Sequence, residues 1–107
     1  LKFPDNLEEI VTKGVQNAKK AVEETGKDGY VALDVGPTGK LLKPLGTLDF
    51  EDAVSIFART IKAGAAAGAD LILIETMSDT YELKAAMLAA VIFLLWQLLF
   101  LVKMARC

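Results

Sequence analysis

Two short apolar segments, each ending beside an acidic residue, constrain this chain more than any other feature. Residues 30–35 read Tyr-Val-Ala-Leu-Asp-Val and contain Asp34, while the apolar residues 71–74 are followed at once by Glu75. Short, continuously apolar runs bounded by polar residues are typical of strands buried on both faces of a parallel sheet. Ligands of parallel α/β proteins bind at the carboxyl ends of the strands, so we expect Asp34 and Glu75 on one such edge.

Three stretches with apolar residues at helical spacing surround these strands. Polar residues or glycine that can start or stop a helix bound them: Asp5 or Asn6, Gly26, Thr47 or Asp49, and Thr80. Asp79 and Glu82 have the spacing of a capping box at the start of the third helix. The lysines of the first helix, Lys19 among them, are predicted to face solvent.

The predicted order is helix, strand, helix, strand, helix. Two strands joined through a helix should be parallel, with a right-handed crossover. Two strands alone cannot bury both faces of a sheet, so the pattern predicts part of a larger sheet or barrel. A long connection at residues 36–48, rich in glycine and proline, is interpreted either as a functional loop or as a plain cover for the sheet edge.

Composition excludes several classes of site within these residues. The 107 residues contain no histidine and one cysteine, Cys107, so imidazole catalysis and a disulfide framework are excluded. A net charge of -2 without a basic block argues against nucleic acid as a partner. The cysteine usage fits a reducing compartment, and we expect a cytoplasmic location.

Three motifs together carry a resemblance to a known family. They are DVGPTGK at residues 34–40, LDFEDA at residues 48–53, and GADLILIETMSD at residues 68–79. In this combination the sequence resembles the homocysteine S-methyltransferase family, in particular the homocysteine-binding domain of cobalamin-dependent methionine synthases. The resemblance covers residues 1–89, which we interpret as a partial homocysteine-binding domain.

The resemblance implies a (β/α)8 TIM barrel, of which this chain would supply about two β/α units. It also implies methyl transfer to homocysteine, a step of methionine biosynthesis, with the thiol bound to zinc as a thiolate. Three cysteines on later strands hold that zinc in the family. Cys107 lies outside the family's cysteine motifs and is not assigned as a ligand. Cobalamin and folate belong to other domains of the long family enzymes.

Three positions are candidates for binding substrate. Glu75 matches the family glutamate that contacts the amino group of homocysteine, and a carboxylate suits an ammonium group. Asp34 and Gly36 would line the mouth of the site. The alternative is structural: Glu75 caps the following turn, and Asp34 and Gly36 only shape a turn. For Asp79, helix capping is the leading interpretation.

Residues 90–107 form a separate, almost wholly apolar tail that departs from the family pattern. A membrane-spanning helix is one interpretation, because Lys103 and Arg106 follow the apolar run. A shifted reading frame is another: read two nucleotides later, one permitted set of codons from Ala90 gives SNLPALATAFPGKDGKV, and the family has a similar N-L-P strand entry there. A buried terminal helix is the third.

Two functions therefore stay open. The chain is either a methyltransferase fragment that is inactive alone, or a βαβ interaction module tethered to a membrane by its apolar helix.

Overall fold

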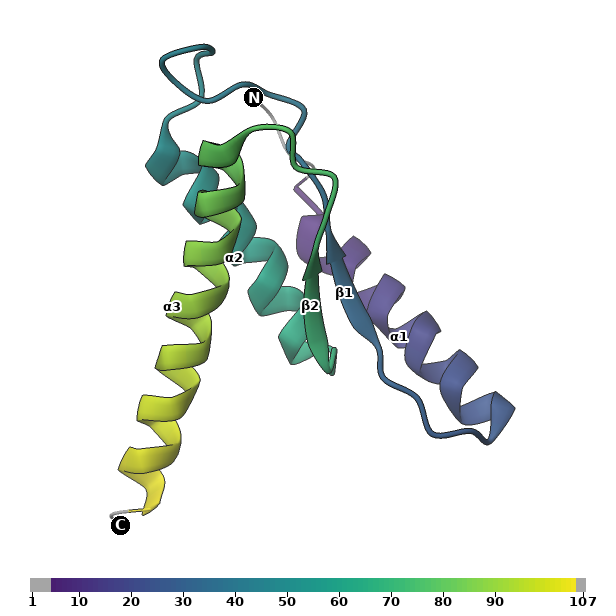
Figure 1. Cartoon of the computed structure of the whole chain (residues 1–107). Coiled ribbons are helices and arrows are strands. Elements are labelled where there is room, and N and C mark those ends of the chain that lie inside the picture. The colour runs from purple at the N-terminus through teal and green to yellow at the C-terminus, as the bar shows by residue number, and fades with distance from the viewer. Residues whose placement is uncertain (1–4, 106–107) are drawn as a thin grey trace.

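The computed structural model describes residues 5–105 as an α/β arrangement of three helices and a two-stranded sheet (Figure 1). The elements in chain order are α1 (Leu7–Thr25), β1 (Ala32–Val35), α2 (Phe50–Ala66), β2 (Leu71–Ile74) and α3 (Thr80–Ala105). This order is the predicted one. The first strand is shorter than the predicted residues 30–35, because Tyr30 and Val31 precede the paired segment.

The two strands pair in parallel, as predicted, with Ala32 opposite Leu71 and Val35 opposite Ile74. Asp70 holds the start of this ladder with its backbone N–H and with its side-chain carboxylate. Its backbone N–H donates to the Val31 carbonyl at 2.8 Å, and its carboxylate accepts from the Val31 N–H at 2.8 Å. The Val31 N–H, which precedes the first residue pair of the ladder, thus has a hydrogen-bond partner in the Asp70 carboxylate.

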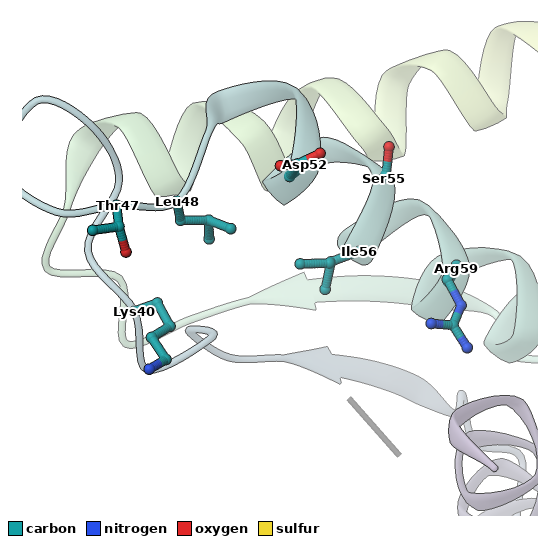
Figure 2. Close-up of a pocket in the computed structure, with 7 residues that line it drawn as sticks. All are labelled: Lys40, Thr47, Leu48, Asp52, Ser55, Ile56 and Arg59. Atoms are coloured by element: carbon teal, nitrogen blue, oxygen red, sulfur yellow. The ribbon is translucent and has the colours of Figure 1, made fainter. Parts of the chain in front are cut away.

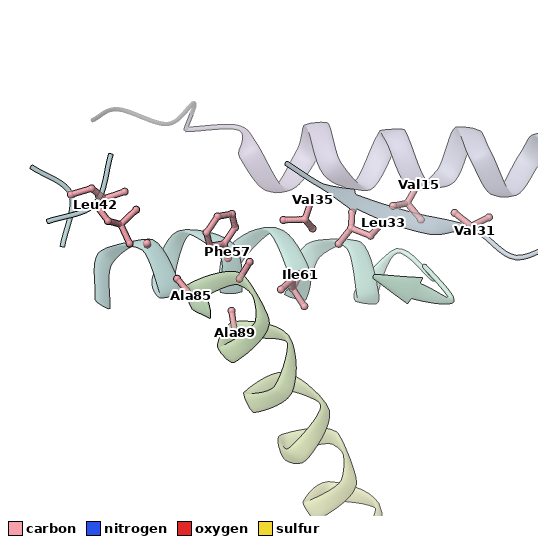
Figure 3. Close-up of a cluster of buried hydrophobic side chains, with 12 residues drawn as sticks. Val15, Val31, Leu33, Val35, Leu42, Phe57, Ile61, Ala85 and Ala89 are labelled. Atoms are coloured by element: carbon pink, nitrogen blue, oxygen red, sulfur yellow. The ribbon is translucent and has the colours of Figure 1, made fainter. Parts of the chain in front are cut away.

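Helix α2 supplies the centre of the core and lies between α1 and α3 (Figure 1). Ala53, Phe57 and Ile61 follow one another at four-residue intervals and are buried. Figure 3 shows Phe57 and Ile61 among side chains from β1, α1 and α3. The other buried apolar residues of this cluster are Val15, Val31, Leu33, Val35, Leu42, Leu48, Ala85, Ala86 and Ala89.

The helix ends follow the sequence signals only in part. Gly26 ends α1 in the left-handed conformation (φ 66°), which glycine adopts without steric cost, and its N–H donates to the Glu23 carbonyl. Asp79 starts α3 by accepting from the Tyr81 N–H at 2.8 Å. Asn6, in contrast, precedes α1 without a side-chain capping bond.

The prediction that the lysines of α1 only face solvent is wrong for Lys19. Its ammonium donates to the Gly68 carbonyl at 2.8 Å, and its side chain lies so close to Gly68 that a Cβ there would be 3.0–3.1 Å from the Lys19 side chain. A cation placed near the last carbonyls of α2 is favourable both as a hydrogen-bond donor and as a charge. At the other end of α1, the Glu8 carboxylate accepts from Arg59 of α2 at 2.9 Å.

One face of the sheet is uncovered. Leu33, Val35, Ile72 and Ile74 face the helices, whereas Leu71 and Leu73 are 45% and 46% exposed on the other face. Two strands alone were predicted not to bury both faces of a sheet, and within residues 5–105 one face is open. The reason is the number of strands, since the three helices gather on one side and nothing in residues 5–105 lies on the other.

Helix α3 is the longest element and continues well beyond the sheet (Figure 1). Its first turns are part of the core through Ala85, Ala86 and Ala89. By length and composition alone, residues 80–97 could cross a membrane, a property that buried helices of soluble proteins share. A long apolar helix is therefore common to the membrane-spanning and the buried-helix interpretations of the tail.

Two glycine substitutions of opposite expected sign test the packing of α2 on β1. A Cβ at Gly64 would lie 2.6 Å from a Leu33 methyl group, whereas a Cβ at Gly14 in α1 meets nothing within 4 Å. We expect Gly64→Ala to destabilise the fold by about 1–3 kcal/mol through overpacking. Gly14→Ala should stabilise it by about 0.5–1 kcal/mol through helix propensity. Urea unfolding of both variants measures this, and equal effects would contradict the close contact.

Candidate functional site

The two acids singled out in the sequence lie side by side at the carboxyl ends of the strands. Asp34 is the third residue of β1 and pairs with Leu73. Glu75 follows β2 directly, and its N–H donates to the Val35 carbonyl at 3.1 Å, so the ladder continues by one bond. Because side chains alternate along a strand, Asp34 and Glu75 both belong to the uncovered face of the sheet.

The proximity of the two carboxylates changes the ionisation of one of them. The Asp34 side chain, first as a hydrogen-bond partner and then as a negative charge, raises the pKa of Glu75 above its ordinary value of 4.5. Partial desolvation acts in the same direction. Two like charges held together in this way would be relieved by a cation placed between them.

Gly36 lies two residues after Asp34 on the same strand exit. A Cβ at this position would meet nothing within 4 Å, so the space beside the end of β1 is open. Asp34, Gly36 and Glu75 therefore border one open region at the edge of the sheet.

Glu82, which the sequence suggested only as a capping residue, is buried and connects α3 to the loop after β1. Glu82 of α3 is 4% exposed, and its carboxylate accepts from the Thr38 hydroxyl at 2.6 Å and the Thr38 N–H at 3.1 Å. The predicted capping-box partnership with Asp79 is wrong, because the loop after β1 offers Glu82 two donors from one residue. Glu82 precedes Ala85, Ala86 and Ala89 at helical intervals, and this pattern in the sequence indicates that Glu82 lies on the core-facing side of α3.

The long connection after β1 has structure of its own. Leu42 and Leu48 form an isolated bridge, supported by the Lys43 N–H donating to the Leu48 carbonyl at 2.9 Å. Both leucines are buried above α2. The carbonyl of Leu41 passes so close to Gly46 that a Cβ there would collide with it. This part of the loop therefore packs on the core through Leu42 and Leu48.

One cavity lies away from the paired acids. It has a volume of about 520 Å³ and is formed between the long loop and α2, where Lys40, Asp52, Ser55 and Arg59 line it (Figure 2). Arg59 is already paired with Glu8, and Lys40 and Asp52 carry opposite charges. The cavity thus offers no concentration of one charge sign that would select a ligand.

The residues present do not fit the zinc site that the family resemblance implies. Within residues 5–105, no group of three histidine, cysteine or acidic side chains comes together in a way that could hold a metal ion. The single cysteine, Cys107, lies outside the described residues. Zinc held by three thiolates needs three cysteines, so these 107 residues cannot supply that site.

Comparison with known families finds a match over nearly the whole sequence. A model of the homocysteine S-methyltransferase family matches residues 1–104. The matched range includes the strand exits with Asp34 and Glu75, and it continues past residue 89 through most of α3.

The coupling of the two acids gives a titration that can be measured. We expect the pKa of Glu75 to be above its ordinary value in the whole chain and to fall in Asp34→Asn, because the neighbouring charge is removed. Asp28→Asn, in the exposed segment before β1, is the matched control and should leave it unchanged. NMR titration of the Glu75 side-chain carboxyl carbon reports each value.

The same shift has a consequence for stability. A carboxyl with a raised pKa in the folded state contributes stability below its unfolded pKa and loses it as the pH rises through the folded pKa. Glu75→Gln should therefore stabilise the chain at pH 7 relative to the unsubstituted chain and have little effect at pH 4. Equal effects at both pH values in thermal unfolding would contradict the repulsion between the acids.

Removal of the Thr38 hydroxyl tests the link between the two strand exits. Thr38→Val leaves the buried Glu82 carboxylate with one donor fewer, and we expect a loss of about 1–3 kcal/mol. Thr25→Val is the control, because its hydroxyl donates to Val22 at an exposed helix end and should cost less than about 0.5 kcal/mol. Chemical denaturation distinguishes the two, and equal losses would argue against the link.

Proposed function

The chain belongs to the homocysteine S-methyltransferase family, and from this premise we propose that it supplies one wall of a homocysteine-binding site. In this proposal Glu75 binds the amino group of homocysteine. Asp34 adds a second negative charge beside it, and the open space at Gly36 admits the substrate.

The adjacency of the Asp34 and Glu75 carboxylates is the observation that carries the proposal. Asp34 lies near the carboxyl end of β1 and Glu75 directly follows β2 on the uncovered face, and Asp34 raises the pKa of Glu75. An ammonium group between them would remove their repulsion and donate a charge-assisted hydrogen bond to each carboxylate. Homocysteine carries such a group, and its thiol would then point away from this wall toward the rest of the site.

The uncovered sheet supports a larger assembly in which this chain is one part. Leu71 and Leu73 expose apolar side chains on the same face as the two acids. In a (β/α)8 barrel that face would be the barrel interior, and strands outside these 107 residues would cover it. The apolar residues would then lie in the packed interior, with Asp34 and Glu75 at its carboxyl-end rim.

Methyl transfer requires more than this wall. The zinc that activates the thiol in the family would be held by cysteines that these residues lack, so we propose that the chain alone is inactive. We assign neither cobalamin nor folate to it. A role in methionine biosynthesis would place the chain in the cytoplasm, and its low cysteine content fits that location.

A segment exchange tests the role of Glu75. Residues 30–82 replace the corresponding segment of a complete homocysteine S-methyltransferase, and the Michaelis constant for homocysteine is measured with and without Glu75→Gln. A charge-assisted hydrogen bond is worth about 1.5–3 kcal/mol, so we expect KM to rise about 10- to 150-fold.

Glu51→Gln is the matched control, because Glu51 is an exposed acid in the first turn of α2, away from the strand exits. It should leave KM unchanged. An equally unchanged KM in Glu75→Gln would contradict the proposed contact. Separately, methyl transfer by the purified 107-residue chain, supplied with zinc and a methyl donor, would overturn the proposed inactivity.

A further inference from the structure

Two sets of hydrogen bonds join the strand exits beside the paired acids. The first is the backbone bond from the Glu75 N–H to the Val35 carbonyl, at 3.1 Å. The second is formed by Glu82, whose carboxylate accepts from the Thr38 hydroxyl at 2.6 Å and from the Thr38 N–H at 3.1 Å. The two exits are thus linked directly at the ends of the strands and again at the start of α3.

The chain between these two links is short. On the side of β1 it consists of residues 36–37, and on the side of β2 of residues 76–81. A short segment with both ends held keeps little conformational freedom. The second link therefore limits how far the two exits can move apart, and with them Gly36 and the carboxylate of Glu75.

The exit of β2 also leaves the strand in a conformation that has to be held. Thr76, directly after Glu75, has a φ of 60°, in the left-handed region that a β-branched residue rarely occupies. Such a conformation persists only where the surrounding structure imposes it. The next fixed points along the chain are Asp79, which caps α3, and Glu82. The direction in which the chain leaves Glu75 thus depends on how firmly the start of α3 is held.

Stability alone does not account for a carboxylate at position 82. Its side chain is buried on the face of α3 that carries Ala85 and Ala89. None of the ion pairs among the described side chains includes Glu82, and both of its donors are neutral groups of Thr38. An apolar side chain of similar size often stabilises a core as well as a buried carboxylate does. The contact therefore favours a role in placing the loop over a role in stabilising the core.

We propose that Thr38 and Glu82 are a positioning pair for the homocysteine site, and that their contact keeps the Glu75 carboxylate beside the opening at the end of β1. Neither residue of the pair touches the substrate. Two like charges move apart unless the backbone that carries them is held, and Asp34 and Glu75 are such charges. The inference rests on the proposed function, because it assigns what holds that site.

The pKa of Glu75 in the whole chain tests the pair, because it reports how close the Asp34 carboxylate lies. In Thr38→Val and in Glu82→Leu we expect this pKa to fall by most of the amount that Asp34→Asn removes. Thr38→Ser keeps the hydroxyl and Glu82→Gln keeps an acceptor without the charge, so both should leave the pKa as it is in the unsubstituted chain. NMR titration of the Glu75 side-chain carboxyl carbon measures each variant.

Ala89→Gly is the matched control for a loss of stability. Ala89 is buried on the same face of α3 but away from the loop, so the variant should unfold more easily and leave the pKa of Glu75 unchanged. Glu82→Leu leaves no buried charge unpaired and stays informative if Thr38→Val does not fold. A pKa unaltered in Glu82→Leu, or lowered as much by Ala89→Gly, would overturn the positioning role.

Failure of the pair and failure of the homocysteine site give different results. A raised KM for homocysteine in the Glu75→Gln segment exchange, with the pKa of Glu75 unaltered in Glu82→Leu, would refute the pair and leave the site in place. An unchanged KM in that exchange, with the pKa lowered in Glu82→Leu, would refute the site and with it the role of the pair in binding homocysteine.

Discussion

The packing of α2 is the constraint on which the rest of the structure depends. Its buried row of Ala53, Phe57 and Ile61 contacts a core built from both strands' inner faces and from α3. Because Gly64 has no Cβ, α2 lies so close to Leu33 that a Cβ at this position would be 2.6 Å from a Leu33 methyl group. Because α2 also connects the two strands, the same helix makes them parallel and brings their carboxyl ends to one edge. The pair of acids at that edge follows from this one crossover.

The loops at the strand exits are fixed by polar contacts as well as by the sheet. Glu82 binds Thr38 across them, and the Glu75 N–H extends the ladder to Val35. The position of the acids is therefore set from the core side, while their carboxylates face outward. In the proposed function, a cationic ligand would relieve the repulsion between the two charges that the strand exits hold together.

Much of this arrangement could be predicted from the sequence, and the exceptions share a cause. Residues 71–74 and the helix starts at Phe50 and Thr80 were predictable because apolar spacing and cap residues are local signals. The neighbouring positions of Asp34 and Glu75 followed from strand polarity alone. The contacts of Lys19 and Glu82 were missed because each depends on a partner more than forty residues away, Gly68 and Thr38 respectively. The open face of the sheet followed from the number of strands, because two strands alone cannot bury both faces.

Helix α1 is attached to the molecule in a different way from the other elements. Val15 is its one buried residue among those that the structure describes, and polar contacts hold its two ends, Glu8 to Arg59 and Lys19 to Gly68. The half-exposed ion pair between Glu8 and Arg59 contributes little and is screened by salt. Detachment of α1 therefore costs less than unfolding of the α2-centred core. Its amide hydrogens would exchange through local opening, faster as ionic strength rises, and the edge of β1 beneath it would be uncovered first.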